Sequence, residues 1–225
     1  MSARLSLLAL LVTAACALPG GPGCGQGGEA GGETPLPPPS LDGGMSLEEA
    51  LTKRRSVRRF QDRALTPAQI GQLAWAAQGI TEPERGFRTA PSAGALYPLE
   101  LYLLTAEGVF RYSPQGHGLV TLAKTDLRTK LAQAALGQRS IASAPLDLVI
   151  TGVYQRTRMK YRQRAERYVH LEAGHVAQNI HLQAVSLGLG SVPVGAFRDA
   201  EVSRVLGLGE EETPLYIIPV GHPDE

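Results

Sequence analysis

Residues 90–101 read Ala90-Pro91-Ser92-Ala93-Gly94-Ala95-Leu96-Tyr97-Pro98-Leu99-Glu100-Leu101. This segment is a loop of small residues that runs directly into an apolar stretch. The backbone of such a loop can approach a flat ligand closely, because Ala and Gly side chains do not hold the ligand off. The segment therefore predicts a ligand-contacting loop followed by a short strand over residues 99–105.

The chain after residue 45 alternates between helical and strand patterns. Ser46 and Thr66 are placed to cap two helices, and Gly188 is placed to end the longest one. The patterns predict helices over residues 46–51, 67–77, 126–136, 166–187 and 199–206. They predict strands over residues 99–105, 109–112, 119–123, 146–153, 191–194 and 215–220. This mixture indicates an α+β domain over residues 45–225, long enough to bury a sizeable core.

Residues 1–15 have the pattern of a signal peptide, with Arg4 before an apolar run over residues 5–12. The run is too short to span a membrane. Small residues before Cys16 resemble a lipobox, which predicts an exported, membrane-anchored lipoprotein, periplasmic in a bacterium. Thr13 departs from the usual Leu, so plain cleavage near Ala15 or Ala17 stays open. A true start at Met45, and a cytoplasmic protein, is the alternative.

Residues 16–44 are rich in Gly and Pro and have no apolar periodicity. This composition predicts a flexible tether that stiffens toward polyproline over residues 37–39 and holds the domain away from a membrane surface. Cys16 and Cys24 both precede the predicted domain. We therefore expect no disulfide and no Cys-based metal site inside it.

The composition argues against two classes of function. The chain has 22 Lys and Arg against 21 Asp and Glu, and such a nearly neutral protein has no general reason to bind nucleic acid. The histidines of the longest helix lack the i, i+4 spacing of a zinc helix. We therefore expect no metal site.

Basic residues gather where the first predicted helix gives way to a loop, at Lys53-Arg54-Arg55-Ser56-Val57-Arg58-Arg59-Phe60. Arginine forks match phosphate oxygens in a bidentate way, and a serine adds a further donor. The segment therefore indicates a phosphate site. A solvated basic helix end, favoured by the helix dipole, is the alternative interpretation.

Two later segments also carry chemistry. Lys160 and Tyr161 lie among several arginines, and a lysine can act as a base where a desolvated site or nearby cations lower its pKa. The alternative interpretation is that Lys160 and Tyr161 are ordinary surface residues that precede a helix. The Gly-rich run over residues 188–197 fits a helix end and tight turn, and its backbone N–H groups could also face a ligand.

These four segments, in this order, resemble the FMN-contacting parts of the nitroreductase family, and in particular its SagB-type (SagB/ThcOx) branch of FMN-dependent dehydrogenases. In azoline-oxidising members of that branch, a Lys-Tyr pair lies shortly before an Arg-Tyr and the long helix. Here Lys160-Tyr161 precedes Arg167-Tyr168 in the same way. Classical nitroreductases carry an Asn in the first loop, and residues 90–101 have none, which points to the SagB-type branch.

The resemblance implies a role for each matched residue. By the resemblance, Arg54, Ser56 and Arg58 would contact the phosphate and ribityl chain of FMN, with Arg55 adjacent. The isoalloxazine edge or ribityl chain would lie against Pro91, Ser92, Ala93 and Gly94, with Tyr97 walling the pocket. A backbone N–H near flavin N5 would come from Pro193, Val194 and Gly195. Proton handling falls to the catalytic pair, Lys160 and Tyr161.

The resemblance also implies an FMN-dependent nitroreductase-like fold, with a central, mostly antiparallel sheet flanked by helices, and a homodimer that holds two FMN molecules at its interface. The implied activity is hydride transfer between FMN and a small-molecule or peptide-derived substrate. An NAD(P)H-dependent nitroreductase-like enzyme and a non-catalytic flavin-binding module are the alternatives. Many nitroreductases supply a later Lys or Arg to the phosphate. Here we expect either a weaker phosphate site or a substitute from Arg59 or Arg63.

Overall fold

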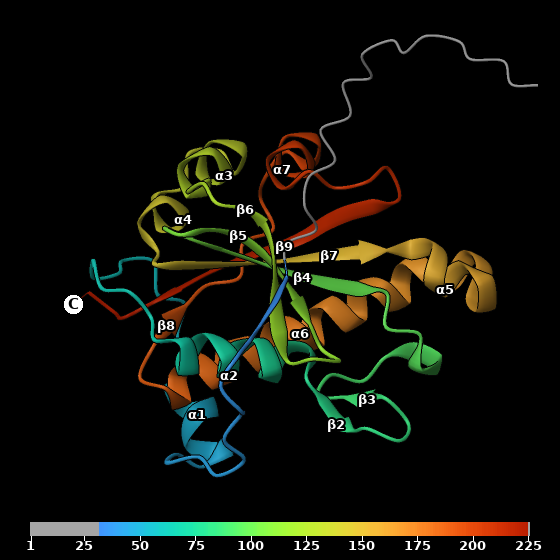
Figure 1. Cartoon of the computed structure of the whole chain (residues 1–225), viewed down its shortest axis with the longest axis horizontal. Helices are drawn as coiled ribbons and strands as arrows, with labels where there is room; N and C mark the ends of the chain where they lie inside the picture. Colours follow the sequence, from blue (N-terminus) through green and yellow to red (C-terminus); the bar gives the residue numbers. More distant parts are fainter. Residues whose placement is uncertain (1–31, 225) are drawn as a thin grey trace, which may run out of the picture. The chain divides into compact units, whose positions relative to one another are not determined.

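A seven-stranded antiparallel sheet lies at the centre of residues 32–224, which the computed structural model describes (Figure 1). Its strand order is β1-β6-β5-β4-β7-β9-β8, and each neighbouring pair is antiparallel. The bounds are β1 Glu33–Pro35, β4 Leu99–Thr105, β5 Gly108–Ser113, β6 Gly118–Ala123, β7 Leu146–Val153, β8 Gly190–Ser191 and β9 Glu212–Gly221. A separate ribbon pairs β2 (Ile80–Glu82) with β3 (Phe87–Arg88). The predicted α+β class and antiparallel sheet are confirmed.

Helices cover both faces of this sheet (Figure 1). On one face lie α1 (Leu47–Lys53), α2 (Pro67–Gln78) and α6 (Ala165–Ser186). On the other lie α3 (Arg128–Ala134), α4 (Arg139–Ser143) and α7 (Asp199–Leu206). Helix α5 (Tyr154–Tyr161) follows directly from the end of β7, and short 3-10 turns occupy Ala93–Ala95 and Arg162–Arg164.

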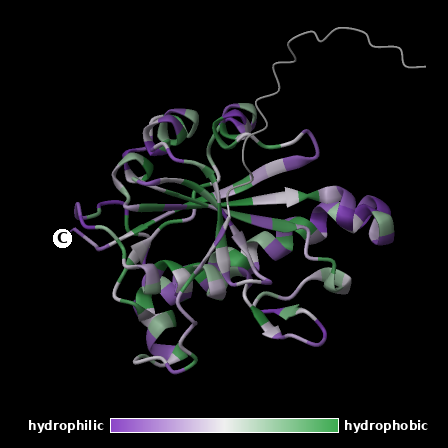
Figure 2. Ribbon diagram, viewed as in Figure 1, coloured by the Kyte–Doolittle hydropathy of each residue, from purple (hydrophilic) through white to green (hydrophobic). Residues whose placement is uncertain are grey.

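The alternation of side chains along β4 explains why each face has its own core. Leu99, Leu101 and Leu103 belong to the core under α2 and α6, whereas Tyr102 and Leu104 belong to the core under α3 and α7. Successive side chains of a strand point to opposite faces, so a continuous apolar run supplies both layers. Figure 2 shows hydrophobic residues concentrated in the central strands and along α6.

Local signals in the sequence set several boundaries correctly. The Ser46 side chain accepts a hydrogen bond from the Glu49 N–H, and Thr66 and Gln69 form a reciprocal capping box at the start of α2. The strands predicted over residues 99–105 and 146–153 match β4 and β7. The sequence did not predict α5, whose residues are mostly polar and bury only Thr157, so its periodicity is weak.

The prediction of a tether over residues 16–44 is wrong for its last part. Strand β1 pairs with β6, and the Leu36 N–H donates to the His117 carbonyl at 2.9 Å. The Ser40 backbone exchanges two hydrogen bonds with the Gln72 side chain of α2, at 2.8 and 3.1 Å. Backbone pairing needs no apolar periodicity, which is why the composition gave no sign of it. The folded unit therefore begins before residue 45.

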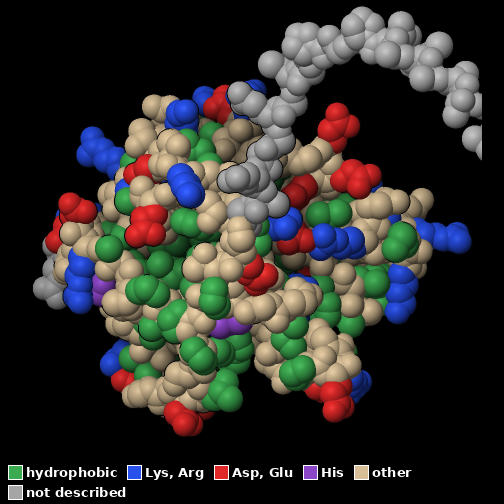
Figure 3. Space-filling view, in the orientation of Figure 1, with side chains coloured by type: hydrophobic (Ala, Val, Ile, Leu, Met, Phe, Trp, Pro, Cys, Tyr) green, Lys and Arg blue, Asp and Glu red, His purple; other side chains and the backbone are tan. Residues whose placement is uncertain are grey.

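This N-terminal segment also closes one side of an apolar groove of about 440 Å³. Leu36 of the segment, Ile70 of α2, and Phe110 and Leu119 of the sheet line the groove. Figure 3 shows hydrophobic side chains gathered in the middle of this face of the molecule. Residues 33–40 are thus a part of the domain surface.

The predictions of a signal peptide over residues 1–15 and a lipid on Cys16 fall on residues 1–31, outside the described part of the chain. The same holds for Cys24 and the first half of the predicted tether. Among residues 32–224, no helix combines the length and the apolar character that a membrane crossing requires.

We expect a chain that starts at residue 45 to be less stable than one that starts at residue 32. The shorter chain loses β1, the Leu36 contacts and the two bonds between Ser40 and Gln72. At roughly 0.5–1.5 kcal/mol per hydrogen bond, the free energy of unfolding should fall by about 2 kcal/mol or more. Urea unfolding of the two chains measures the difference, with the full chain as reference. Equal midpoints would contradict the docking of residues 33–40.

Candidate functional site

The basic segment after α1 lies beside the Gly-rich segment after α6. Ser56 forms a parallel bridge with Ser191, and the Val57 N–H donates to the Ser191 carbonyl at 3.0 Å. Gly190 permits this approach, because a Cβ there would lie 2.6 Å from Cβ of Val57. The structure therefore joins two of the predicted segments that are far apart in sequence.

A hydrogen-bonded chain of side chains holds Arg54 in this place. Arg54 Nη1 lies 3.2 Å from Nε2 of His181, and Nδ1 of His181 lies 2.5 Å from the Ser191 hydroxyl. Arginine can only donate, so Nε2 accepts and Nδ1 carries the proton that faces Ser191. Burial, and then the charge of Arg54, lower the pKa of His181 to about 4, which keeps the imidazole neutral. His181 is thus a positioning residue for Arg54.

The other basic residues of this segment behave differently. Arg55 Nη1 donates to the carbonyls of Thr52 and Arg54, at 3.0 and 2.7 Å, and so folds back onto the end of α1. The structure therefore does not support a ligand-facing role for Arg55. Ser56 and Arg58 are exposed. Together with Arg54 they present two guanidinium groups and a hydroxyl, a donor set that fits a phosphate.

The loop over residues 91–97 packs directly against the predicted catalytic pair. Gly94 has a φ of +66°, and a Cβ there would lie 2.9 Å from both Lys160 Nζ and the Tyr161 hydroxyl. Ala95 and Tyr97 also have positive φ values, of 54° and 45°. The positive φ favours glycine at position 94, and the loop brings the second and third predicted segments together.

Tyr97 is fixed from three sides. Its N–H donates to the Ser92 hydroxyl at 2.9 Å, and its carbonyl accepts from Arg156 at 3.1 Å. Its hydroxyl accepts from the Arg88 N–H at 3.2 Å, and the Arg88 guanidinium lies 4.5 Å from its ring centroid. A ring held in this way can wall a pocket, as predicted.

Lys160 itself is exposed on the last turn of α5, with Nζ 5.5 Å from the ring centroid of Tyr161. Tyr161 packs edge-on against Tyr168, with centroids 4.9 Å apart. Arg156 is engaged by Glu100 as well as by Tyr97. The desolvated surroundings expected for the lysine are therefore not formed by residues 32–224 of one chain.

Glu172 of α6 lies behind this loop and was not predicted as a site residue. It is 2% exposed, its Oε1 has no partner among the described residues, and Ser92 donates a hydrogen bond to the carboxyl. Burial raises the pKa of Glu172 to about 7, against smaller opposing effects of Ser92 and Arg88. A signal was available, because a carboxyl between Val169 and Val176 falls on the buried face of the helix.

We expect Glu172→Gln to stabilise the protein at pH 8 and to have little effect at pH 4. The carboxyl titrates at about 7 in the folded chain and at about 4.5 ordinarily. The folded state therefore holds the extra proton between these values, and wild-type stability falls as the pH rises through this window. The glutamine variant avoids this loss, which is about 3 kcal/mol at most. Urea unfolding at several pH values measures it, with exposed Glu166→Gln as control. A difference that does not vary with pH would refute the assignment.

Of the residues expected to offer an N–H to the flavin, Val194 already uses its N–H within the fold. The Val194 N–H donates to the Ile217 carbonyl at 2.8 Å, and the Ile217 N–H donates back at 3.0 Å. Pro193 has no N–H. Val194 therefore has no free N–H to offer a flavin. Gly195 is exposed, and its contact with a flavin stays a prediction.

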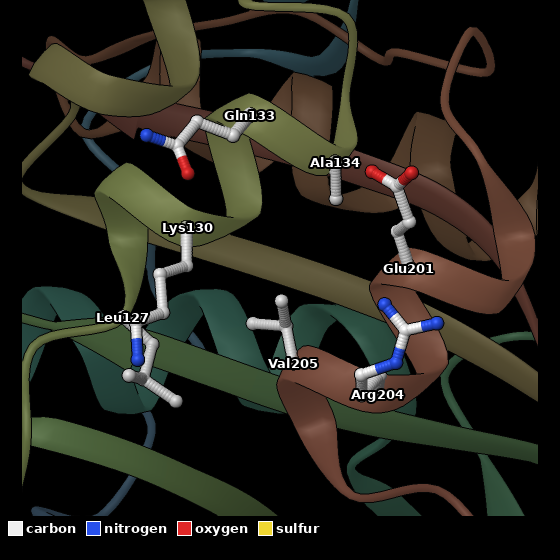
Figure 4. Close-up of a pocket in the computed structure, with 7 residues that line it drawn as sticks. All are labelled: Leu127, Lys130, Gln133, Ala134, Glu201, Arg204 and Val205. Carbon is white, nitrogen blue, oxygen red and sulfur yellow. The ribbon is translucent and has the colours of Figure 1, made fainter.

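A cavity of about 410 Å³ lies elsewhere, between α3 and α7. Figure 4 shows Lys130 and Gln133 of α3 across from Glu201 and Arg204 of α7. No residue of the predicted site lines this cavity. It is therefore separate from the candidate site.

Comparison with known proteins shows which family the chain resembles in sequence and in fold. The profile of the Nitroreductase family matches residues 51–222. A Methanocaldococcus jannaschii protein, named provisionally as a nitroreductase, is 46% identical over 187 residues, covering 80% of this chain and 93% of its own length. A solved structure from Ralstonia eutropha, also named provisionally as a nitroreductase, has a TM-score of 0.79 at 31% identity, covering 86% of this chain and 90% of that one.

Two relatives with more specific names are similar at lower identity. The Vibrio harveyi NADPH:FMN oxidoreductase, solved with NAD⁺, has a TM-score of 0.60 at 26% identity, covering 80% of this chain and 69% of that one. The Escherichia coli microcin B17-processing protein McbC is 25% identical over 160 residues, 66% of this chain and 59% of its own length. The chain therefore belongs to the nitroreductase family, a family of FMN-dependent oxidoreductases.

Proposed function

We propose that this chain is a SagB-type FMN-dependent dehydrogenase that oxidises a small-molecule or peptide-derived substrate. The observation that carries the proposal is the contact of Gly94 with Lys160 and Tyr161. Lys160 and Tyr161, which we propose to handle the proton, thus lie against a loop of small residues. The absence of an Asn in residues 90–101 and the similarity to McbC also favour this branch.

The residues present fit FMN at two places. Arg54, Ser56 and Arg58 supply cations and a hydroxyl for a phosphate, and His181 holds Arg54 in position. Ser92 to Gly94 supply a loop that no side chain beyond Cβ blocks, apart from the Ser92 hydroxyl, which is turned toward Tyr97 and Glu172. Bound FMN would supply a hydride acceptor. Lys160, with Tyr161 beside it, would take the proton from the neighbouring carbon of the substrate.

We also propose that the enzyme is a homodimer whose two copies complete each flavin site. Within one chain, Arg54 contacts α6 at His181, whereas Ser92 contacts the same helix at Glu172. These positions are nine residues apart, which is about 14 Å along the axis and half a turn around it. The phosphate residues and the ring-facing loop therefore lie on opposite sides of α6 in one chain. A second copy would bring the two kinds of surface together.

An NAD(P)H-dependent nitroreductase-like activity is the alternative function. Similarity to the Vibrio harveyi enzyme, solved with NAD⁺, favours it. The two functions differ in the source of the hydride. They also differ in the need for a base, because NADH gives up a hydride without releasing a proton that a base must take.

The absorbance spectrum of the purified chain with added FMN tests these proposals. Under anaerobic conditions, bleaching of the flavin bands by a small thiazoline, but not by NADH, supports the SagB-type assignment. Bleaching by NADH alone supports the alternative. Bands that only dithionite bleaches would indicate a flavin-binding module, and absence of flavin binding would refute both functions.

We propose, in addition, that residues 1–15 direct export and that Cys16 carries a lipid. Oxygen or a membrane carrier would then be the electron acceptor. Incorporation of labelled palmitate in a bacterial host that Cys16→Ser abolishes would support this; unlabelled protein in the cytoplasm would refute it.

A further inference from the structure

A small cavity of about 210 Å³ lies between the end of α2, the start of β4 and the turn from β5 to β6. Its polar lining includes Gln78, Arg88, Glu100 and Arg156. None of these residues belongs to the predicted phosphate or catalytic sets. The cavity is therefore a second polar site, separate from the residues proposed to hold FMN.

Gln78 lines this cavity and has a side-chain donor that no described residue uses. Its side chain is 2% exposed, and its Oε1 accepts a hydrogen bond from Arg88 Nη1 at 2.7 Å. That bond fixes the orientation of the Gln78 amide, because the oxygen must face Arg88. The NH₂ group is therefore the part of the amide that makes no hydrogen bond to a described residue. Nε2 has no partner among the described residues. A buried donor without an acceptor costs about 1–3 kcal/mol, so a ligand that accepts from Gln78 would recover this energy.

The charges around the cavity leave one cation available. Arg156 forms an ion pair with Glu100. Arg88 makes no ion pair within residues 32–224, and burial lowers its pKa, which reflects the cost of holding this charge away from water. Gln78 and Arg88 are hydrogen-bonded to each other, and both residues line the cavity.

We propose that this cavity binds a small carboxylate, with Gln78 Nε2 and the Arg88 guanidinium as its ligands. A guanidinium fork matches a carboxylate in a bidentate way. The cavity volume of about 210 Å³ suits a carboxylate of two to four carbons. One water takes about 30 Å³, so the cavity has room for only a few waters or a small molecule, and a nucleotide would not fit. Arg88 also stacks on Tyr97, so a bound carboxylate would brace the loop that carries Gly94.

Acetate is the probe that tests this site. The full chain is saturated with FMN, so that acetate does not compete for the phosphate residues, and its unfolding temperature is followed as acetate replaces chloride at constant ionic strength. We expect a saturable rise. The same titration without FMN keeps this test independent of the proposed function, because the cavity contains no FMN ligand.

Gln78→Glu is the decisive variant. It keeps an oxygen acceptor for Arg88, replaces the donor by a second carboxylate oxygen, and should raise the acetate concentration at half effect at least tenfold, roughly the loss of one charge-assisted contact. Arg88→Lys, which keeps the charge without the fork, should also weaken binding. Arg198→Gln, at the exposed residue that precedes α7, makes the same change in net charge and should leave the response intact. An unaltered response in both cavity variants, or no saturable response in the wild type, would show that the cavity holds only water.

Discussion

Replacing Lys160 by alanine is expected to slow flavin reduction by a thiazoline substrate at least about 100-fold, while FMN stays bound. A positioned general base contributes roughly 100- to 10,000-fold to a rate. Lys160, the base that we propose, lies against the Gly94 loop. The side chain is exposed, so its removal should leave the fold and the flavin spectrum unchanged. Anaerobic stopped-flow absorbance of the FMN-loaded protein measures the rate.

Two comparisons keep this result interpretable. Met159→Ala changes the preceding residue of α5, which is 77% exposed, and should react at the wild-type rate. If NADH also reduces the wild-type flavin, Lys160→Ala should leave that reaction unchanged, because NADH delivers no proton to the lysine. A Lys160→Ala protein that oxidises thiazoline at full rate would overturn the catalytic role and the SagB-type assignment with it.

Arg54→Ala is expected to weaken FMN binding about 10- to 100-fold. A hydrogen bond to a charged partner is worth about 1.5–3 kcal/mol, and each 1.4 kcal/mol is a factor of ten in affinity. Fluorescence titration with FMN gives the dissociation constant. Lys53→Ala is the matched control, since this neighbouring cation pairs with Glu49 on the exposed side of α1. Equal losses in both variants would indicate a general effect of charge rather than a phosphate contact.

His181→Ala should weaken FMN binding less than Arg54→Ala, because the imidazole acts by holding the guanidinium in place. The double variant Arg54→Ala/His181→Ala should then bind FMN no more weakly than Arg54→Ala alone. Strictly additive losses would mean that His181 does not work through Arg54. The affinity of the His181 variant should recover in part with glutamine at this position, which keeps an acceptor for Arg54.

The parts of the fold that the sequence predicted are those set by neighbours along the chain. Ser46 and Thr66 cap their helices through bonds to residues three positions on, and the apolar run of β7 is long enough to mark a buried strand. Helix α5 and β1 were missed for the opposite reason. The first has little apolar periodicity, and the second is held by backbone hydrogen bonds to β6, which require no apolar pattern in the sequence.

For the candidate site too, the sequence predicted the features set by neighbouring residues and missed those set by the folded chain. The resemblance to the family, through motifs in the same order, predicted Arg54, Ser56, Arg58, the Ser92–Gly94 loop and the Lys160-Tyr161 pair as site residues. The sequence could not show that Arg55 folds back onto α1, or that the Val194 N–H donates to the Ile217 carbonyl. Both depend on which backbone groups the folded chain leaves unpaired.

The sequence by itself determined the α+β class, most helix and strand positions and the chemistry available to the site. Only the tertiary structure decided that His181 holds Arg54, that Glu172 lies buried behind Ser92, and that the Gln78 donor has no partner within residues 32–224. These relations join residues from separate elements, and their energies come from burial and from hydrogen bonds made or missing across the fold. Neither quantity exists until the sheet and α6 have assembled.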